Sequence, residues 1–343
     1  MTKTAAKTKK PAAKKAYKAD GPKVDLYAVV TDKIVAALEA GVRPWMKPWN
    51  APAGGSFGGQ LPRRVTGQAY TGINVVLLWA EASDRGYANP TWMTFKQAIE
   101  LKGGVRKGEK GTTIVYASKF KKDVDDGKGG TKEAWIPFLK SYTVFNVEQI
   151  DGLPEKFYLK AEEPVTVDEA VKAKLERIEH ADAFFLATGG VVKHGGGRAF
   201  FTQGGDYIQM PEFDSFKEAE GYYATLGHEF VHWTGSDKRL NRVFGAKFGD
   251  EAYAAEELVA ELGSAFLCAT LGITPEVRED HAAYIQSWLK VLKGDKRFIF
   301  TAASLATKAV EHLSAYSEED ADLGEPDTII EAVEEDAALA MAA

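Results

Sequence analysis

Cysteine is almost absent from this chain, and long apolar runs are missing altogether. The 343 residues hold one cysteine, Cys268, so no disulfide can form within the chain and a reducing compartment is expected. No apolar run reaches the roughly 18 residues of a membrane-spanning helix. The lysine-rich N-terminus lacks the apolar segment of a secretory signal. We therefore expect a cytoplasmic protein with no membrane partner.

Charge is unevenly distributed along the chain. Residues 1–23 hold eight Lys and one Asp, whereas residues 317–343 hold ten Asp and Glu and neither Lys nor Arg. Because residues 1–23 are also poor in large apolar groups, they are predicted to be a disordered basic arm. This arm either contacts phosphates or serves only as a solubilising tail. Residues 317–343 are predicted to be an acidic tail. The basic excess continues through residues 24–150, which suits a polyanionic partner.

The most specific pattern is H-E-x-x-H, within GYYATLGHEFVHWTG at residues 221–235. On a helix, His228 and His232 lie on one face about one turn apart, so both imidazoles can reach one Zn²⁺ at ~2.0–2.1 Å. Glu229 lies where its carboxylate can act as general base on the attacking water. Gly235 is a plausible stop signal for the helix. The alternative is a buried helix with two histidines satisfied inside the core.

A catalytic zinc site also needs a third protein ligand and an open position. Glu257 and Glu261 lie four residues apart on a predicted apolar helix, where two carboxylates on one face are costly unless a cation or donor meets them. We predict that Glu257 is the third ligand and that Glu261 orients a ligand histidine through its other ring nitrogen. Glu256 is expected to face solvent. The predicted cofactor is one divalent ion, Zn²⁺ first, with Mn²⁺ or another ion as alternatives; a salt-bridged helix face is the alternative to a metal site.

Hydrophobic periodicity predicts a small α+β domain over residues 24–150. It begins with a helix at residues 24–41, and further helices are expected from about Asn74 and over residues 91–101. A basic strand then pairs, across an Asp/Gly-rich turn at residues 123–130, with the strand in AWIPFLKSYTVFNVEQI.

Residues 151–166, which contain two prolines, are predicted to be a linker. A second domain is expected over residues 167–316. Its first element is a charged amphipathic helix at residues 167–188, and two short strands precede the H-E-x-x-H helix.

Aromatic residues interleaved with Lys and Arg in the first domain indicate single-stranded DNA binding. Bases stack on exposed rings at ~1–3 kcal/mol each while cations follow the backbone. The predicted DNA-binding residues are Arg43, Trp45, Lys47, Trp49, Arg63, Arg64, Tyr70, Trp92, Arg106, Lys107 and Lys110. The basic strand adds Phe120, Lys119, Lys121 and Lys122 as further candidates. The alternative is that most of these aromatic residues belong to the core.

Several blocks of the sequence resemble the ArdC family of antirestriction proteins, found on plasmids and phages. The matching blocks are VTDKIVAALEAGVRPWMKPW, YTGINVVLLW, WMTFKQAIELKGGVRKGEKGT, YTVFNVEQIDGLP, YIQMPEFDSF, GHEFVHWTG, EELVAELGSAFL and HAAYIQSWLKVLKGDKRFIF. The resemblance implies an N-terminal single-stranded-DNA-binding domain and a C-terminal zincin-like metallopeptidase domain. It also implies protection of incoming mobile DNA from host restriction. The lysine-rich arm and the acidic tail depart from the family pattern.

Three hypotheses follow from different classes of protein. The first is a zinc peptidase tethered to single-stranded DNA, with a host restriction enzyme or another protein as its peptide substrate. The second is a DNA-binding protein whose metal domain is structural or docks a partner without proteolysis. The third is an acidic decoy that imitates DNA. The third is the weakest, because the acidic residues gather in one tail instead of covering a folded surface.

Overall fold

The computed structural model describes residues 25–46, 60–125, 130–158, 177–242, 251–273 and 282–317. The described residues from Leu26 onward belong to one compact unit. The predicted basic arm, Lys47, Trp49 and all but the first residue of the predicted acidic tail lie outside the described residues. Among the helices of the described ranges, none is both long and apolar enough to cross a membrane.

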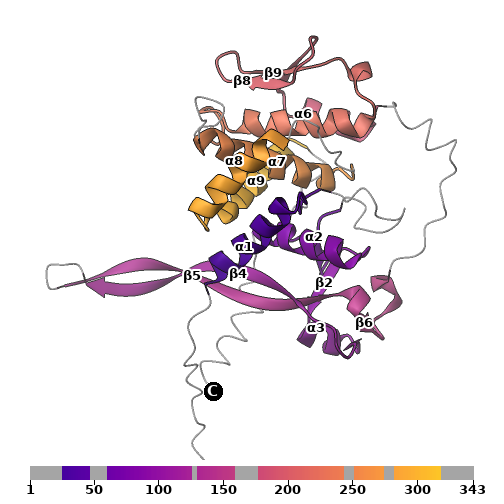
Figure 1. Cartoon of the computed structure of the whole chain (residues 1–343), viewed down its shortest axis with the longest axis vertical. Helices are drawn as coiled ribbons and strands as arrows, with labels where there is room; N and C mark the ends of the chain where they lie inside the picture. The colour runs from indigo at the N-terminus through magenta and orange to yellow at the C-terminus, as the bar shows by residue number, and fades with distance from the viewer. Residues whose placement is uncertain are drawn as a thin grey trace, which may run out of the picture. The chain divides into compact units, whose positions relative to one another are not determined.

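The N-terminal half combines three helices with a small sheet (Figure 1). The helices are α1 (Leu26–Glu39), α2 (Ile73–Arg85) and α3 (Phe95–Glu100). The sheet has the order β1-β2-β5-β4 and consists of β1 (Arg63–Arg64), β2 (Thr91–Thr94), β4 (Thr112–Asp125) and β5 (Thr131–Asn146). A second pair joins β3 (Gly104–Val105) to β6 (Ile150–Asp151). Thus part of the predicted linker pairs with the first half of the chain, and a short η2 turn (Glu155–Phe157) follows it.

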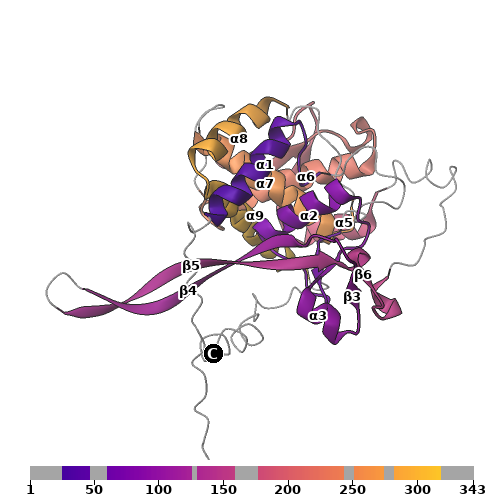
Figure 2. The same ribbon diagram turned by 60° about the horizontal axis from the view of Figure 1, so that its bottom comes forward.

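Strands β4 and β5 form the predicted hairpin, and most of this hairpin extends beyond the other strands of the sheet. They are antiparallel from Thr112 opposite Val144 to Asp125 opposite Thr131. Only the base of this ribbon joins β2, where Thr94 is paired with Val144. The outer part therefore projects from the sheet as a two-stranded ribbon (Figures 1 and 2).

The C-terminal half is mainly helical. Its elements are α5 (Glu179–Ala187), α6 (Ala219–Thr234), α7 (Glu251–Thr270), α8 (Ala282–Gly294) and α9 (Phe298–Ser314). Beside α6 lies a sheet of order β7-β9-β8, built from β7 (Val191–His194), β8 (Phe200–Thr202) and β9 (Tyr207–Met210). The sequence predicted two strands here. The third arises because β7 pairs in parallel with β9, while β8 folds back against β9 in the antiparallel sense.

Helices from both halves share one hydrophobic core. Thr31 Oγ1 on α1 donates a hydrogen bond of 2.6 Å to the Lys296 carbonyl, and the Gly72 amide donates one of 3.0 Å to Thr307 Oγ1 on α9. The Trp45 ring meets Trp288 of α8 edge to face at 6.0 Å. The α+β class is as predicted, with two domain types in one chain, but the helices of the first half complete the core of the second.

Candidate metal centre

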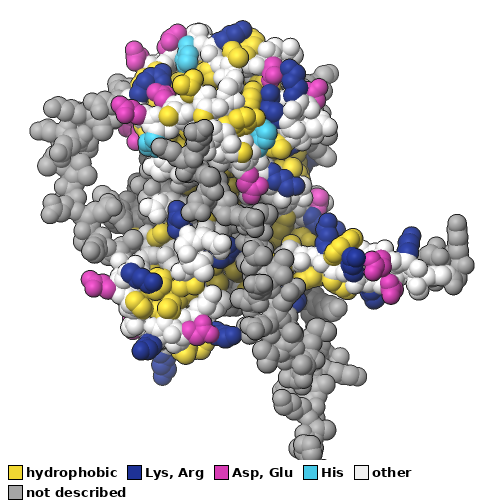
Figure 3. Space-filling view, turned by 180° about the vertical axis from the view of Figure 1, so that it is seen from behind, with side chains coloured by type: hydrophobic (Ala, Val, Ile, Leu, Met, Phe, Trp, Pro, Cys, Tyr) yellow, Lys and Arg dark blue, Asp and Glu magenta, His cyan; other side chains and the backbone are white. Residues whose placement is uncertain are grey.

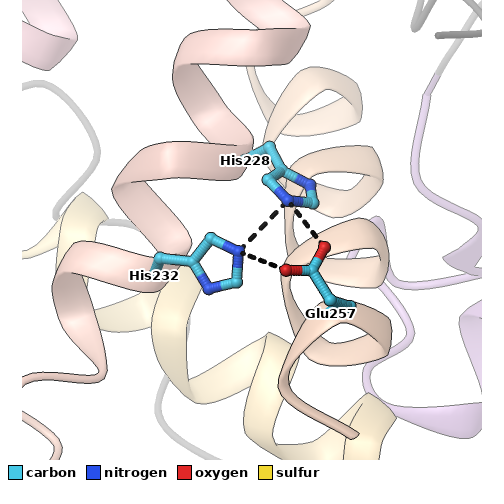
Figure 4. A group of neighbouring side chains, drawn as sticks. All are labelled: His228, His232 and Glu257. Carbon is cyan, nitrogen blue, oxygen red and sulfur yellow. Dashed lines mark hydrogen bonds and ion pairs between the residues drawn. The ribbon is translucent and has the colours of Figure 1, made fainter. Parts of the chain in front are cut away.

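Helix α6 carries both histidines of the H-E-x-x-H motif. It runs over Ala219–Thr234 and is buried along most of its length, because aromatic and aliphatic side chains occupy nearly every face. His228 is 6 % exposed and Glu229 is 4 % exposed. The helix ends at Thr234, and the Gly235 amide donates to the His232 carbonyl at 2.8 Å. The predicted stop at Gly235 is thus confirmed, and His228 and His232 face the same neighbour, α7 (Figure 4).

Helix α7 comes close enough to α6 to present a carboxylate to both histidines. A Cβ atom at Gly263 would lie 2.7 Å from Val231 Cγ2, so only glycine allows this separation of the two helices. Ser264 Oγ also donates a hydrogen bond of 2.7 Å to the Ala224 carbonyl of α6. Slightly less than two turns before this contact, α7 carries Glu257, which points at the two imidazoles (Figure 4).

The donor atoms of His228, His232 and Glu257 converge on one point. The two Nε2 atoms are 3.2 Å apart, His228 Nε2 lies 3.5 Å from Glu257 Oε2, and His232 Nε2 lies 3.5 Å from Glu257 Oε1. Ligands at ~2.0–2.1 Å from a tetrahedral ion are separated from one another by about 3.3 Å. Two imidazole nitrogens and a carboxylate at these separations fit a divalent metal ion, and the three residues form a group that could hold one.

A second glutamate on α7 holds His232 from the other side of its ring. Glu256 Oε1 lies 3.2 Å from His232 Nδ1, so an N–H at Nδ1 leaves the Nε2 lone pair directed at the cluster. Arg242 binds the same carboxylate, with Nε 3.0 Å from Oε2 and Nη2 2.7 Å from Oε1. The expectation that Glu256 faces solvent was wrong, since it is 5 % exposed. The chain after α6 folds back and brings Arg242 over Glu256, which periodicity alone does not reveal.

The carboxylates of Glu256 and Glu257 favour positive charge in this cluster. Burial by itself would lower the pKa of His232, but contacts with Glu256 and Glu257 raise this pKa to about 10. Burial acts in the opposite sense on Glu257, yet its two histidine partners hold the pKa of that carboxyl well below its usual range. Two carboxylates thus stabilise positive charge at His232, and a divalent ion bound to both imidazoles would supply that charge in place of a proton.

Glu229 lies beside the cluster without being part of it. It follows His228 on α6 and is buried. Within the described part of the chain, none of the hydrogen bonds or ion pairs engages its carboxylate, and its oxygen atoms are not among the fully enclosed side-chain atoms. A carboxylate in this position can accept a proton from a water molecule next to the three converging donors.

Glu261, one turn beyond Glu257, meets residues from the N-terminal half. Arg43 Nη1 lies 3.2 Å from Glu261 Oε1, and Trp45 Nε1 donates to the same oxygen at 3.3 Å. We predicted that Glu261 orients a ligand histidine, but the carboxylate that contacts the second ring nitrogen of His232 belongs to Glu256. The arrangement fastens the segment after α1 to the helix that carries Glu257.

The structure also revises the predicted DNA-binding residues. The rings of Trp45, Tyr70 and Trp92 are 2 %, 5 % and 0 % exposed, so they pack in the core and offer no face to a base. Arg43 is held by Glu261, and Arg64 lies over the Tyr70 ring at 4.9 Å. Basic side chains that do reach the surface are Arg63, Arg106, Lys107 and Lys110. Binding of DNA by these four stays a prediction.

Comparison with known proteins identifies two family matches. Residues 24–145 match the family model described as the N-terminal domain of anti-restriction factor ArdC. Residues 179–305 match the model of a zincin-like metallopeptidase. The first covers the β-ribbon and its sheet, and the second covers the helices that bring His228, His232 and Glu257 together.

Individual relatives and solved structures are similar to this chain over most of its length. The chain is 40 % identical over 300 residues to the uncharacterized protein y4eC of Sinorhizobium fredii, covering 85 % of this chain and 92 % of that one. It is 38 % identical over 304 residues to the DNA primase TraC of Escherichia coli, of which it covers 27 %. The metal-free crystal structure of antirestriction protein ArdC from plasmid R388 is 44 % identical, with a TM-score of 0.72, covering 86 % of this chain and 99 % of that chain. Its Mn(II)-bound structure gives a TM-score of 0.69 over the same shares.

Proposed function

This chain belongs to the family of ArdC antirestriction proteins, and from this premise we propose that it protects incoming mobile DNA from host restriction. In this proposal it binds single-stranded DNA with its N-terminal half. It holds one divalent metal ion at His228, His232 and Glu257. The observation that carries the metal proposal is the convergence of two imidazole nitrogens and a carboxylate within 4.8 Å of one another.

The proposed ion is Zn²⁺. Two histidines and one glutamate are the donor set of catalytic zinc sites that keep a position open for water or substrate. The relative from plasmid R388 has been crystallised with Mn(II), so manganese is the alternative to test. When bound, the ion supplies a Lewis acid that polarises a peptide carbonyl and favours ionisation of water.

The chain's own residues would then divide the work of peptide hydrolysis. Glu229 takes the proton from the attacking water and passes it to the leaving amine. Glu256, itself held by Arg242, fixes the ring orientation and tautomer of His232. The close contact of α6 with α7 at Gly263 keeps the donor atoms in position. This would make the protein a metallopeptidase, with the peptide substrate to be found among host proteins.

Metal content after dialysis tests the first part of the proposal. Wild-type protein dialysed against a weak chelator should retain about one Zn²⁺ per chain, measured by plasma emission spectroscopy. His232→Ala should lose most of it and melt at a lower temperature, because a bound ion stabilises only the folded state. Glu229→Gln is the matched control, since it alters the adjacent buried position without removing a proposed ligand. Full zinc occupancy in His232→Ala would contradict the assignment.

Plasmid transfer into a restricting host separates the first two hypotheses, a zinc peptidase and a DNA-binding protein whose metal domain has no proteolytic role. Glu229→Gln should keep metal and DNA and lose hydrolysis by ~10²–10⁴-fold, the usual worth of a general base. If protection of the plasmid survives this change at equal protein level, DNA binding is what protects, and the metal domain is structural or docks a partner. If protection disappears, proteolysis is required. We expect survival, because a DNA-binding half can shield incoming DNA without chemistry.

A further inference from the structure

Four aromatic rings form a continuous row on one face of the β4–β5 ribbon. Tyr142 and Tyr116 have ring centroids 6.4 Å apart, Tyr116 and Phe138 are 6.1 Å apart, and Phe138 and Phe120 are 5.9 Å apart. Phe120 is 45 % exposed, and the other three are partly exposed. None of the four is among the residues that form, or pack against, the two hydrophobic cores of the described chain. We refer to Tyr116, Phe120, Phe138 and Tyr142 as the aromatic row.

The pairing register places lysines, and no acidic residue, on the same face. Side chains alternate between the faces of a strand, and Phe120 pairs with Ile136 and Tyr116 with Lys140. By the same register, Lys122 and Lys132 lie on the face of the aromatic row. Lys140 Nζ lies over the Phe138 ring at 5.3 Å. Between Thr112 and Asn146, none of the acidic side chains that the structure describes falls on this face.

The opposite face of the ribbon has a different charge pattern. Asp123 and Glu133 are directly paired there, and Lys121 is bound to Glu133 at 3.0 Å. This face also carries Trp135, which is 61 % exposed and has Lys121 Nζ 5.5 Å from its ring centroid. On this face, acidic side chains offset the positive charge that an anion would meet. On the face of the aromatic row, the lysines have no acidic side chain beside them in the pairing register. Figure 3 shows hydrophobic, basic and acidic side chains along the ribbon.

We propose that the face of the ribbon with the aromatic row is the surface on which this chain binds single-stranded DNA. The inference rests on the proposed function, which it makes specific to one surface. A row of rings spaced by about two residues of strand can stack successive unpaired bases, and flanking lysines can follow the phosphates. Duplex DNA does not meet this requirement, because its base faces are already stacked. The lysines favour an anionic partner over a neutral or basic one, and the row of exposed rings favours unpaired bases over an acidic protein surface.

Binding of the full-length protein to a fluorescent oligothymidine, measured by anisotropy at low salt, tests this surface. Each base–ring stack is worth ~1–3 kcal/mol, so Phe120→Ala combined with Phe138→Ala should weaken binding on the order of 30-fold or more. Trp135→Ala, on the opposite face, is the matched control and should change the affinity by less than about three-fold. Both variants should retain wild-type metal content.

A second set of variants keeps the test valid if loss of two rings disturbs the ribbon. Lys122, Lys132 and Lys140 are exposed, so changing all three to Gln leaves the packing intact. The slope of log affinity against log salt should then fall by about 2, at ~0.7 per phosphate contact on a single strand. Binding to a duplex of the same length is the control for charge alone, and the ring substitutions should leave it unchanged.

The outcomes distinguish failure of this inference from failure of the proposed DNA binding on which it rests. If the wild type gives no anisotropy change at low salt, the proposed DNA binding fails. If the wild type binds and both the ring variant and the lysine variant bind equally well, the aromatic row is not the binding surface. The same conclusion holds if Trp135→Ala is the change that abolishes binding, or if the ring variant weakens single-stranded and duplex DNA to the same extent.

Discussion

The α6–α7 cluster and the β4–β5 ribbon place their functional groups in opposite environments. In the cluster, His228, Glu256 and Glu257 are less than 9 % exposed, and their charges are balanced within the protein. On the ribbon, Phe120 is about half exposed and the neighbouring lysines reach solvent. The buried cluster therefore suits a small ion held in fixed geometry, whereas the ribbon offers an open surface to a long partner.

Substitutions in the cluster and on the ribbon should also differ in their effect on stability. A buried charge whose partner is removed is strongly destabilising, because no water takes the place of that partner. An exposed lysine or ring can be removed with little effect on folding, so its removal reports on binding alone. Four predictions use this difference, beginning with the largest expected effect.

Cys268, on α7, should be almost inert in the folded protein. It is buried, and burial raises its pKa to about 12. Against an ordinary thiol with a pKa of ~8.5, the thiolate fraction at pH 8 falls by ~10³-fold. Reaction with a disulfide reagent should slow by at least that factor relative to the protein in urea. Since the folded-state pKa is raised, the stability from keeping the thiol neutral is complete below pH ~8.5 and is lost as pH rises toward 12. Reaction of the native protein at the unfolded rate would mean that the α7 region opens.

Arg43→Ala should destabilise the protein by about 3 kcal/mol or more, because it removes a guanidinium that is paired with the buried Glu261 carboxylate. The measurement is urea unfolding of the metal-free protein, followed by circular dichroism. Arg106→Ala is the control, since Arg106 forms exposed ion pairs with Glu109 and Asp151. Such pairs contribute at most about 1 kcal/mol. Equal effects of the two substitutions would contradict a tightly packed contact between the two halves.

Glu256→Gln should weaken zinc binding by about 10–100-fold, the usual worth of a residue that orients a ligand histidine. The amide keeps the shape of the carboxylate but removes the charge that holds His232 and Arg242. Competition with a chromophoric chelator measures the affinity. Glu261→Gln is the matched control on the same helix, and it should change zinc affinity by only a few-fold. The reverse ranking would restore the role that the sequence predicted for Glu261.

Lys107→Gln with Lys110→Gln should produce the smallest effect, a few-fold loss of affinity for single-stranded DNA. Both lysines are exposed but lie away from the aromatic row in the sequence, in the turn before β4. Removal of each lysine that binds a phosphate should lower the salt slope by ~0.7, without altering any preference for single strands over duplex. A larger loss of affinity than that of the ring variant would move the main DNA surface from the ribbon to this turn.

The sequence could predict the histidine pair of the α6–α7 cluster because helix geometry fixes that pair locally. Residues four apart on a helix face the same way regardless of the rest of the fold, so His228 and His232 had to present their imidazoles together. Glu257 was identified because a carboxylate on an apolar helix needs a partner. The structure brings these three residues together.

The DNA-binding residues were harder to predict, because aromatic residues look alike in sequence whether they are buried or exposed. Trp45 and Trp92 are among the largest fully enclosed side chains of the described protein. A better signal was present in β4 and β5, where Tyr116 and Phe120, and Phe138 and Tyr142, recur at even spacing. That spacing places rings on one face of a strand, but the register between the two strands decides whether they meet.

By itself, then, the sequence determined the helix with its two histidines, the facing glutamate, the basic hairpin and the α+β class. Only the tertiary structure decided that Glu256 and not Glu261 meets His232, that Arg43 and Trp45 bind Glu261, and that the rings of the ribbon form one row. Sequence patterns and tertiary contacts act over different separations along the chain. Helical and strand periodicity act over a few residues, whereas burial and pairing depend on which distant surfaces pack together, and those contacts span more than 200 residues between Arg43 and Glu261.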